Sequence, residues 1–237
     1  MEVIEVHRWP SDDTIAQLVV VDHRRHLDAA DIRQSVAHAR AGRPTAIRTG
    51  ALFPDVADAF AAEGFHVIDT LALLTRDVRR GDDRDAFAKA RRRASKDGLR
   101  MRPLRHRRLA RAADVDRAAF GDGWGHNAAS LSRIAEATPR SHQRVVLADR
   151  DVIAFAITGF GEQRGYLQRI AVEPSQQRRG LGRLLVLDSL HWLGRQGANA
   201  AMVNTGTDNT AALTLYETLG FRTARDRLRV MELTLDG

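Results

Sequence analysis

The chain contains no cysteine, and its positive charge comes almost entirely from arginine, since Lys89 and Lys96 are its only lysines. Without cysteine there is no disulfide framework, no thiolate metal site and no catalytic thiol, which excludes a ping-pong mechanism through an acyl-cysteine. No apolar run is long enough to span a bilayer, and residues 1–10 lack the apolar core of a signal peptide. We therefore expect a cytoplasmic protein without a membrane partner.

The 237 residues carry a formal net charge of +7, with 43% hydrophobic and 28% charged residues, a composition typical of a globular protein. A basic chain suggests nucleic-acid binding, because clustered arginines release counterions from phosphate backbones. The densest arginine clusters, in residues 91–93 and 100–108, have no interleaved aromatic side chains. This pattern favours a solvated linker or helix face, and we do not expect a nucleic-acid partner.

A glycine-bearing turn lies between an apolar strand predicted over residues 166–172 and an apolar-periodic helix predicted over residues 180–193. A helix begins with N–H groups that have no helical partner, and its dipole adds partial positive charge there, so such a turn attracts anions. Gly180 and Gly182 let the main chain approach a pyrophosphate closely. The arginines beside them are Arg178, Arg179 and Arg183. The spacing fits neither the dinucleotide-binding nor the Walker motif, and taken alone the glycines are equally explained by a tight connection.

A second motif follows in residues 209–221, and the two motifs together resemble the GNAT superfamily of acetyl-CoA-dependent N-acetyltransferases. The first motif of that superfamily, Q/R-x-x-G-x-G/A, is matched by Gln177, Gly180 and Gly182. The second, N-x-x-A-x-x-x-Y-x-x-x-G-F, is matched by Asn209, Ala212, Tyr216, Gly220 and Phe221. The resemblance covers residues 100–235.

The resemblance implies an α/β fold (α+β), in which a mostly antiparallel, twisted sheet is flanked by helices and its central strands splay apart to admit the pantetheine arm. It also implies acetyl-CoA as the co-substrate and no metal. The residues that would hold acetyl-CoA are Ile170, Ala171, Val172, Gln177, Arg178, Arg179, Gly180, Leu181, Gly182, Arg183, Asn204, Asn209, Ala212 and Tyr216. Of the strand residues only the main chain is expected to act, because the side chains of Ile170 and Val172 fit a core equally well.

Tyr216 matches the usual general acid of the superfamily, whose hydroxyl lies near the coenzyme A sulfur. The alternative is a tyrosine that only packs against the sheet. Asn209 stands seven residues earlier, on the same face of the predicted helix. It would bind the cofactor arm or cap the helix.

No general base is evident in the sequence. Asn204 and Gln168 occupy positions where members of the superfamily carry a carboxylate, and neither amide accepts a proton at neutral pH. The candidates are Asp122 and His126, in a loop that also carries three glycines and Trp124. Histidine has a suitable ordinary pKa, and the indole could line an acceptor site. A helix–helix turn with a buried tryptophan and an exposed histidine explains the same loop.

The motifs divide the chain into a GNAT acetyltransferase domain at residues 99–237, a charged connector at 81–98, and a smaller α/β segment at 1–80. In the last segment, Phe60 to Phe65 echoes Tyr216 to Phe221, with a phenylalanine where the tyrosine stands. Because this segment lacks the glycine turn, it is predicted to be a degenerate GNAT-like half with a structural role. An ordinary helix with a glycine C-cap explains it equally.

The function implied is transfer of an acetyl group from acetyl-CoA directly to a primary amine, which is either a small molecule or a protein N-terminus. The alternative is a regulatory module that binds acyl-CoA without turnover, favoured by the missing base. A net charge of +7 gives no electrostatic reason to attract polycationic amines. The sequence leaves open whether the chain forms a homodimer.

Overall fold

The computed structural model describes residues 3–21 and 27–235. The chain forms two compact units. The first contains residues 1–73, 204–212 and 223–237, and the second contains residues 74–203 and 213–222. Three of the four boundaries between these ranges fall within strands, and the fourth falls within a helix. Among the described residues, no helix has both the length and the apolar character needed to cross a membrane.

The first unit is a small sheet covered by two helices. Strand β1 pairs antiparallel with β2, β2 pairs parallel with β3, and β3 pairs antiparallel with the C-terminal strand β10. Its core is apolar, and Leu18, Ile32 and Phe60 are completely buried. Its elements are β1 (Ile4–Arg8), β2 (Ile15–Val20), α1 (Ala29–Ala41), β3 (Ala46–Thr49), α2 (Pro54–Ala62), the start of β4 (His66–Asp77), and most of β10 (Arg222–Thr234).

The second unit is a larger sheet between two helical layers. Its strand order is β9-β8-β7-β6-β5, antiparallel except for the parallel pair β8 and β9. The strands are β5 (Leu99–Pro103), β6 (Arg140–Ala148), β7 (Asp151–Gly161), β8 (Arg164–Val172) and β9 (Ala200–Gly206). The helices are α3 (Arg84–Lys96), α4 (Leu109–Phe120), α5 (Ala128–Glu136), α6 (Leu181–Gln196) and α7 (Thr210–Thr218), with short 3-10 turns η1 (His106–Arg108) and η2 (Pro174–Gln176).

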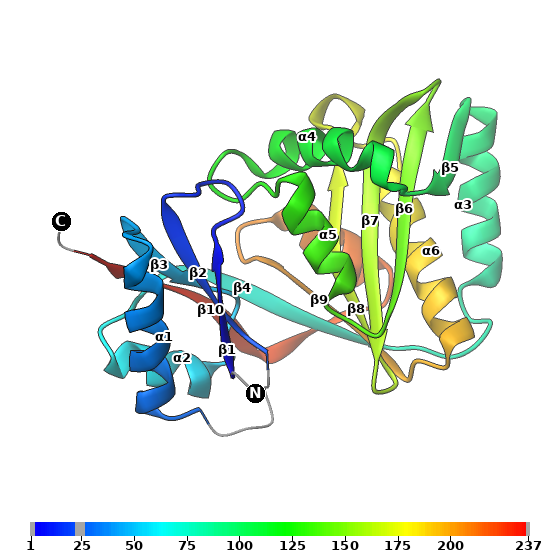
Figure 1. Cartoon of the computed structure of the whole chain (residues 1–237). Coiled ribbons are helices and arrows are strands. Elements are labelled where there is room, and N and C mark those ends of the chain that lie inside the picture. The colour runs from blue at the N-terminus through cyan, green and yellow to red at the C-terminus, as the bar shows by residue number, and fades with distance from the viewer. Residues whose placement is uncertain (1–2, 22–26, 236–237) are drawn as a thin grey trace. The chain divides into compact units, whose positions relative to one another are not determined.

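The two faces of this sheet carry separate apolar clusters. Phe155 and Ile157 of β7 pack with α4 and α5, whereas Ala154 and Ala156 pack with α6 on the opposite face. This alternation is the period of two that a strand imposes on its side chains. The layers are visible edge-on, with α3 and α6 on one side of the sheet and α4 and α5 on the other (Figure 1). The predicted α/β fold, a sheet flanked by helices, is confirmed.

The structure adds detail to the predicted domain ranges. The charged connector, a linker or a charged helix by its sequence, contains helix α3, which belongs to the second unit, where Phe87, Ala90 and Ala94 pack in the cluster that includes α6. Residues 223–234, placed by the sequence in the acetyltransferase domain, belong to the first unit, where β10 pairs with β3.

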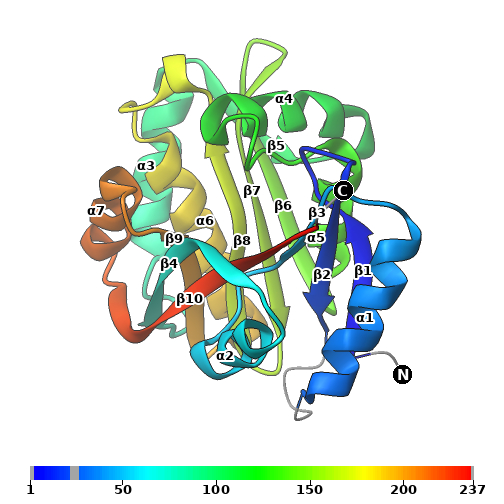
Figure 2. The same ribbon diagram turned by 90° about the vertical axis from the view of Figure 1, so that its left-hand side faces the viewer.

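The turns after α2 and α7, two helices labelled in Figure 2, have matching main-chain hydrogen bonds. Phe65 N–H donates to the Phe60 carbonyl over 3.2 Å, and Phe221 N–H donates to the Tyr216 carbonyl over 3.0 Å. In each turn the two rings meet edge to face, with centroids 5.1 Å apart in the first and 5.6 Å in the second. The glycines between them have positive φ, +90° at Gly64 and +82° at Gly220, which an L side chain rarely adopts.

The order of pairing is shared as well. Strands β1 and β2 are antiparallel and β2 and β3 are parallel, just as β7 and β8 are antiparallel and β8 and β9 are parallel. A helix connects the parallel pair in both cases, α1 in the first unit and α6 in the second. Both observations support the internal repeat predicted from residues 60–65.

Candidate active site

Among the residues that the structure describes, the C-terminal half of strand β8 is not paired with β9. Its parallel pairing with β9 runs from Arg164 to Tyr166, although β8 continues to Val172. On its other edge, the register with β7 shifts so that Gln168 is skipped, which is a bulge that bends the strand. Within the described residues, the main-chain groups of residues 167–172 that point away from β7 therefore have no partner in β9. This geometry provides the splayed strands that the resemblance predicts.

The side chains of this part of β8 are occupied with packing. Ile170 and Val172 pack against the cluster that includes α6, and Ala171 packs against the cluster that includes α4. Ile170 and Val172 are partly buried by this packing, and a ligand contact through the main chain of residues 170–172 stays a prediction.

The turn from β8 into α6 leaves the start of the helix open. Gly180 is the N-cap residue, with φ +81°, and no side chain caps the first turn. Arg178 also has positive φ, +63°, which is uncommon for a residue with a side chain. Gly180 faces open space, whereas a Cβ on Gly182 would come within 3.1 Å of Leu215 Cδ2. The turn thus presents main-chain N–H groups and the positive end of the helix dipole to solvent.

The rest of the predicted phosphate-binding turn surrounds this opening. Arg178, Arg179 and Arg183 are exposed, and the Gln177 amide donates to the Val172 carbonyl over 3.3 Å, linking the turn to the end of β8. Leu181 is buried and anchors the helix start in the core. An open helix N-terminus with three arginines suits a pyrophosphate, so these residues fit the phosphates of coenzyme A.

Three other predicted cofactor residues, Asn204, Asn209 and Ala212, lie in the first unit. Asn209 Oδ1 accepts the Ala212 N–H over 3.1 Å, so this side chain caps α7. Asn204 is exposed near the end of β9. The cofactor role of all three residues stays a prediction.

Tyr216 lies in the second unit and is buried, with 6% of its surface exposed. Burial raises the pKa of its hydroxyl to about 12, against the opposing effect of the Arg169 cation. Its ring packs edge to face on Phe221, and within the described residues its hydroxyl has no hydrogen-bond partner. The hydroxyl is therefore protonated at neutral pH and free to donate, which a general acid requires.

The loop that carries the two candidate bases is fixed by hydrogen bonds. His126 N–H donates to Asp116 Oδ2 over 2.6 Å. Ser130 Oγ donates to the Asn127 carbonyl over 2.9 Å, so we assign it as acceptor for His126 Nδ1–H, 3.1 Å away. This tautomer leaves a lone pair on His126 Nε2. Asp122 is exposed at the tip of the loop.

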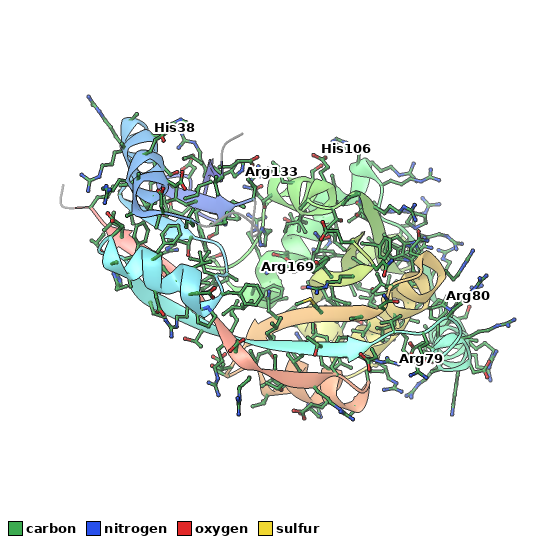
Figure 3. All side chains as sticks on the ribbon, turned by 90° about the horizontal axis from the view of Figure 1, so that it is seen from below. His38, Arg79, Arg80, His106, Arg133 and Arg169 are labelled. Carbon is green, nitrogen blue, oxygen red and sulfur yellow. The ribbon has the colours of Figure 1, made fainter. Side chains whose placement is uncertain are left out.

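His126 is poorly suited to take a proton. Burial, and then the positive charges of Arg169 and Arg133, both labelled in Figure 3, lower its pKa to about 3. A general base works best when its pKa lies near the working pH. The lowered pKa disfavours His126 as the base and leaves its Nε2 as a neutral hydrogen-bond acceptor, so the identity of the base stays a prediction.

Sequence reasoning missed Arg169 and Asp116, which form the most buried ion pair of this region. The available signal was a charged residue in each of two apolar segments, β8 and α4. Glu173, the residue after β8, accepts a hydrogen bond from Arg111 Nη2 over 3.2 Å.

Comparisons with known proteins identify the family that this part of the chain resembles. Residues 109–221 match the acetyltransferase (GNAT) family. The chain is 41% identical over 80 residues to the [ribosomal protein bS18]-alanine N-acetyltransferase of Salmonella typhimurium, covering 34% of this chain and 54% of that protein. It is 43% identical over 60 residues to the mycothiol acetyltransferase of Nocardia farcinica, covering 25% of this chain and 20% of that protein. The chain thus spans about half the length of the first relative and a fifth of the second.

A tandem GNAT protein from the clavulanic acid biosynthesis pathway has a similar fold, with a TM-score of 0.59 at 17% identity, over 93% of this chain and 75% of that one. The chain therefore carries a GNAT acetyltransferase domain, at residues 109–221, as its two sequence motifs predict.

Proposed function

We propose that the chain is an N-acetyltransferase that transfers an acetyl group from acetyl-CoA directly to a primary amine. The observation that carries this proposal is the uncapped start of α6 at Gly180, next to the unpaired end of β8 and in the same unit as Tyr216. A phosphate-binding turn, free strand backbone and a protonated hydroxyl are the three parts that such a transfer needs. Membership of the GNAT family supports the same reaction.

Acetyl-CoA would supply the acetyl group as a thioester. The N–H groups of residues 180–183 and the exposed arginines would hold its pyrophosphate, and the free main chain of residues 170–172 would bind its arm and polarise the thioester carbonyl. Tyr216 would then donate its proton to the sulfur as the C–S bond breaks and the amine nitrogen forms the new bond to carbon. Its pKa of about 12 keeps that proton in place until it is needed. The nitrogen would give up one proton to the tyrosinate, directly or through water, which leaves a neutral amide and restores the hydroxyl.

The site favours an acceptor that arrives as a neutral amine. His126, with a pKa of about 3, does not remove a proton near pH 7, and Asp122 lies exposed at the loop tip. An α-amino group has an ordinary pKa of about 7.7–8.0, whereas a lysine amine has one of about 10.4, so far more of the first is neutral at pH 7.5. A peptide N-terminus or a small amine of low pKa is therefore the proposed acceptor. Two relatives are named for a protein alanine acceptor and for mycothiol.

Calorimetric titration with acetyl-CoA, followed by thiol release in the same sample with pooled peptides and amines, tests this proposal. We expect binding, and thiol release that depends on an α-amine acceptor. Binding without release from any pool would instead favour the regulatory, acyl-CoA-binding module. Absence of binding would overturn the assignment of the α6 turn. A cytoplasmic location and a homodimer are not addressed by this experiment.

A further inference from the structure

A bidentate ion pair joins helix α4 to strand β8. Arg169 Nε donates to Asp116 Oδ1 and Arg169 Nη2 donates to Asp116 Oδ2, both over 2.7 Å. The Asp116 side chain is completely buried, and 15% of the Arg169 side chain is exposed. Parallel N–H···O bonds of this kind fix the orientation of both groups.

Both members of the pair also bind the loop at residues 121–127. Asp116 Oδ2 accepts the N–H of His126 over 2.6 Å, and Arg169 Nη2 donates to the carbonyl of Trp124 over 2.9 Å. The guanidinium also lies 3.6 Å from the centre of the Phe120 ring, at the residue where α4 ends and the loop begins. The cofactor strand and the loop are thus connected through one pair of side chains.

The loop itself has little freedom. Gly125 N–H donates to the Gly121 carbonyl over 2.9 Å, and a Cβ on Gly125 would lie 2.6 Å from Arg117 Cγ and 2.9 Å from Arg117 Cα. At the far end Asn127 Oδ1 accepts the Ser130 N–H over 2.9 Å and caps α5. A short, closed turn of this kind moves as one piece, so its position depends on what anchors it.

A buried ion pair adds little to the free energy of folding, because both charges must be desolvated. Apolar residues of similar volume often stabilise a protein equally well, because the charges do not have to be desolvated. They would not, however, make directed bonds to the His126 N–H and the Trp124 carbonyl. The ion pair therefore fixes the position of the loop through directed hydrogen bonds, whereas an apolar contact would only hold the surfaces together.

We propose that Arg169 and Asp116 are positioning residues, which hold the loop at residues 121–127 against β8 so that an acceptor amine bound at His126 Nε2 meets the thioester carbonyl. This inference rests on the proposed function and adds the residues that set the acceptor geometry. Neither side chain is required to touch the reacting atoms. A misplacement of about 1 Å in such a site costs of order 100-fold in rate.

The test compares Arg169→Lys with Arg111→Lys. Arg111 lies on α4, the helix that carries Asp116, and makes a bidentate pair with Asp151 over 2.8 and 3.1 Å. That pair is exposed, and among the described residues it makes no hydrogen bond to the loop. Both changes keep the positive charge and remove the fork. For Arg169→Lys we expect the acceptor KM to rise about 10-fold or more and kcat to fall, while acetyl-CoA affinity stays within about twofold. Arg111→Lys should leave all three values within about twofold.

A second readout does not depend on turnover. The imidazole nitrogens of His126, followed by NMR in the full chain, should stay neutral well below pH 5 in the native protein and in Arg111→Lys. In Arg169→Lys the loop loosens, and His126 should titrate closer to its ordinary pKa of about 6.5, although the local charge is unchanged. If that variant does not fold, the nearly isosteric Asp116→Asn carries the same expectation for the acceptor KM and for acetyl-CoA affinity. The titration is read in Arg169→Lys alone, because Asp116→Asn leaves the Arg169 cation without its carboxylate and so changes the charge beside His126.

Unchanged acceptor KM and unchanged His126 titration in the folded variant would overturn the proposal. So would an acetyl-CoA affinity that falls as much as the acceptor KM rises, because the pair would then support the cofactor strand and not the loop. If the native protein transfers no acetyl group at all, the proposed function fails. The titration still tests the anchoring of the loop in that case.

Discussion

The two helices that follow a β-hairpin in this protein begin in opposite ways. Helix α1 begins at Asp28, whose Oδ1 accepts the Asp31 N–H over 2.9 Å, and Asp31 Oδ2 accepts the Asp28 N–H over 3.3 Å. This capping box fills the helix N-terminus with two carboxylates. Helix α6 begins at Gly180 without a side-chain cap, beside exposed arginines. Similar strand pairing thus leads to a helix start that is filled by carboxylates in the first unit and is open to an anion in the second.

The turns after α2 and α7 differ in one group that matters for the proposed chemistry. Hydrogen bonds, ring packing and the positive-φ glycine agree between them, and the difference is the hydroxyl of Tyr216, which is absent from Phe60. The first half has kept the packing of such a turn without the reactive group. Both comparisons favour the second unit as the location of the proposed function, and a structural role for the first unit stays a prediction.

Removing the hydroxyl is expected to have the largest effect. Tyr216→Phe should lower kcat by about 10² to 10⁴, because a positioned general acid contributes that much, while acetyl-CoA affinity stays within about twofold. Steady-state kinetics and calorimetry measure both values. The converse change, Phe60→Tyr, should leave kcat unaltered and destabilise the protein by about 1–3 kcal/mol, because it buries a hydroxyl without a partner. Equal loss of activity in both variants would contradict the comparison.

A side chain at the start of α6 is expected to have the second largest effect. Gly180→Val should weaken acetyl-CoA binding by about 100-fold, equivalent to losing two main-chain hydrogen bonds to phosphate at about 1.5 kcal/mol each. The matched control is Gly197→Val at the other end of the helix. Gly197 has φ +83°, compared with +81° for Gly180, and a Cβ at either position meets nothing within 4 Å. Both variants strain the backbone equally, so a shared loss of affinity would refute the assignment of the turn.

The pH dependence of catalysis tests whether His126 removes a proton from the acceptor amine. Since the pKa of His126 is lowered to about 3, kcat/KM should show no inflection from this residue between pH 5 and 9. The rate should rise with pH as the acceptor amine loses its own proton, and the midpoint should move when an amine of different pKa is supplied. A midpoint near 6.5 that disappears in His126→Gln would show that the histidine is the base after all.

The same lowered pKa predicts a stability effect. The native state binds fewer protons at His126 than the unfolded state does, so its contribution is complete above pH 6.5 and is lost as pH falls toward 3. The slope is at most about 1.4 kcal/mol per pH unit. Denaturant unfolding at pH 7 and pH 5 should show a smaller pH difference in His126→Gln than in the native protein. An identical difference would mean that the imidazole titrates normally.

The smallest expected effect belongs to the first unit. Asp28→Ala removes the cap of α1 and should lower the free energy of unfolding by about 1 kcal/mol. Acetyl-CoA affinity and kcat should not change, because the capped helix is not a phosphate site. Denaturant unfolding and calorimetry measure the two quantities. An acetyl-CoA affinity that changes with Asp28 would show that the first half takes part in binding.

The sequence predicted the parts of the fold that local chemistry determines. The glycine pair at residues 180 and 182, the helix that carries Tyr216, and the turn at residues 60–65 all follow from short-range patterns, and the structure places an open helix start and a matched turn there. Helix α3 was harder to interpret, because the arginines at 91–93 mask an apolar face of only a few residues.

Long-range partners could not be predicted in the same way. The pairing of β10 with β3 joins residues such as Leu233 and Ile47, and no turn geometry specifies that register. Asp116 and Arg169 are 53 residues apart, so each is visible in the sequence only as an isolated charge in an apolar segment. The lowered pKa of His126 depends on burial and on that distant arginine, and its residue type alone suggested a base.

Calorimetric titration of the full chain with acetyl-CoA tests the central claim most directly, because it counts the sites. One molecule bound per chain, with the heat lost in Gly180→Val and kept in Asp28→Ala, is the result that the account predicts. Two molecules bound per chain would contradict it, since the capped helix α1 would then also be a site. Undiminished binding in Gly180→Val would contradict it as well, because the open start of α6 would not be where the phosphates lie.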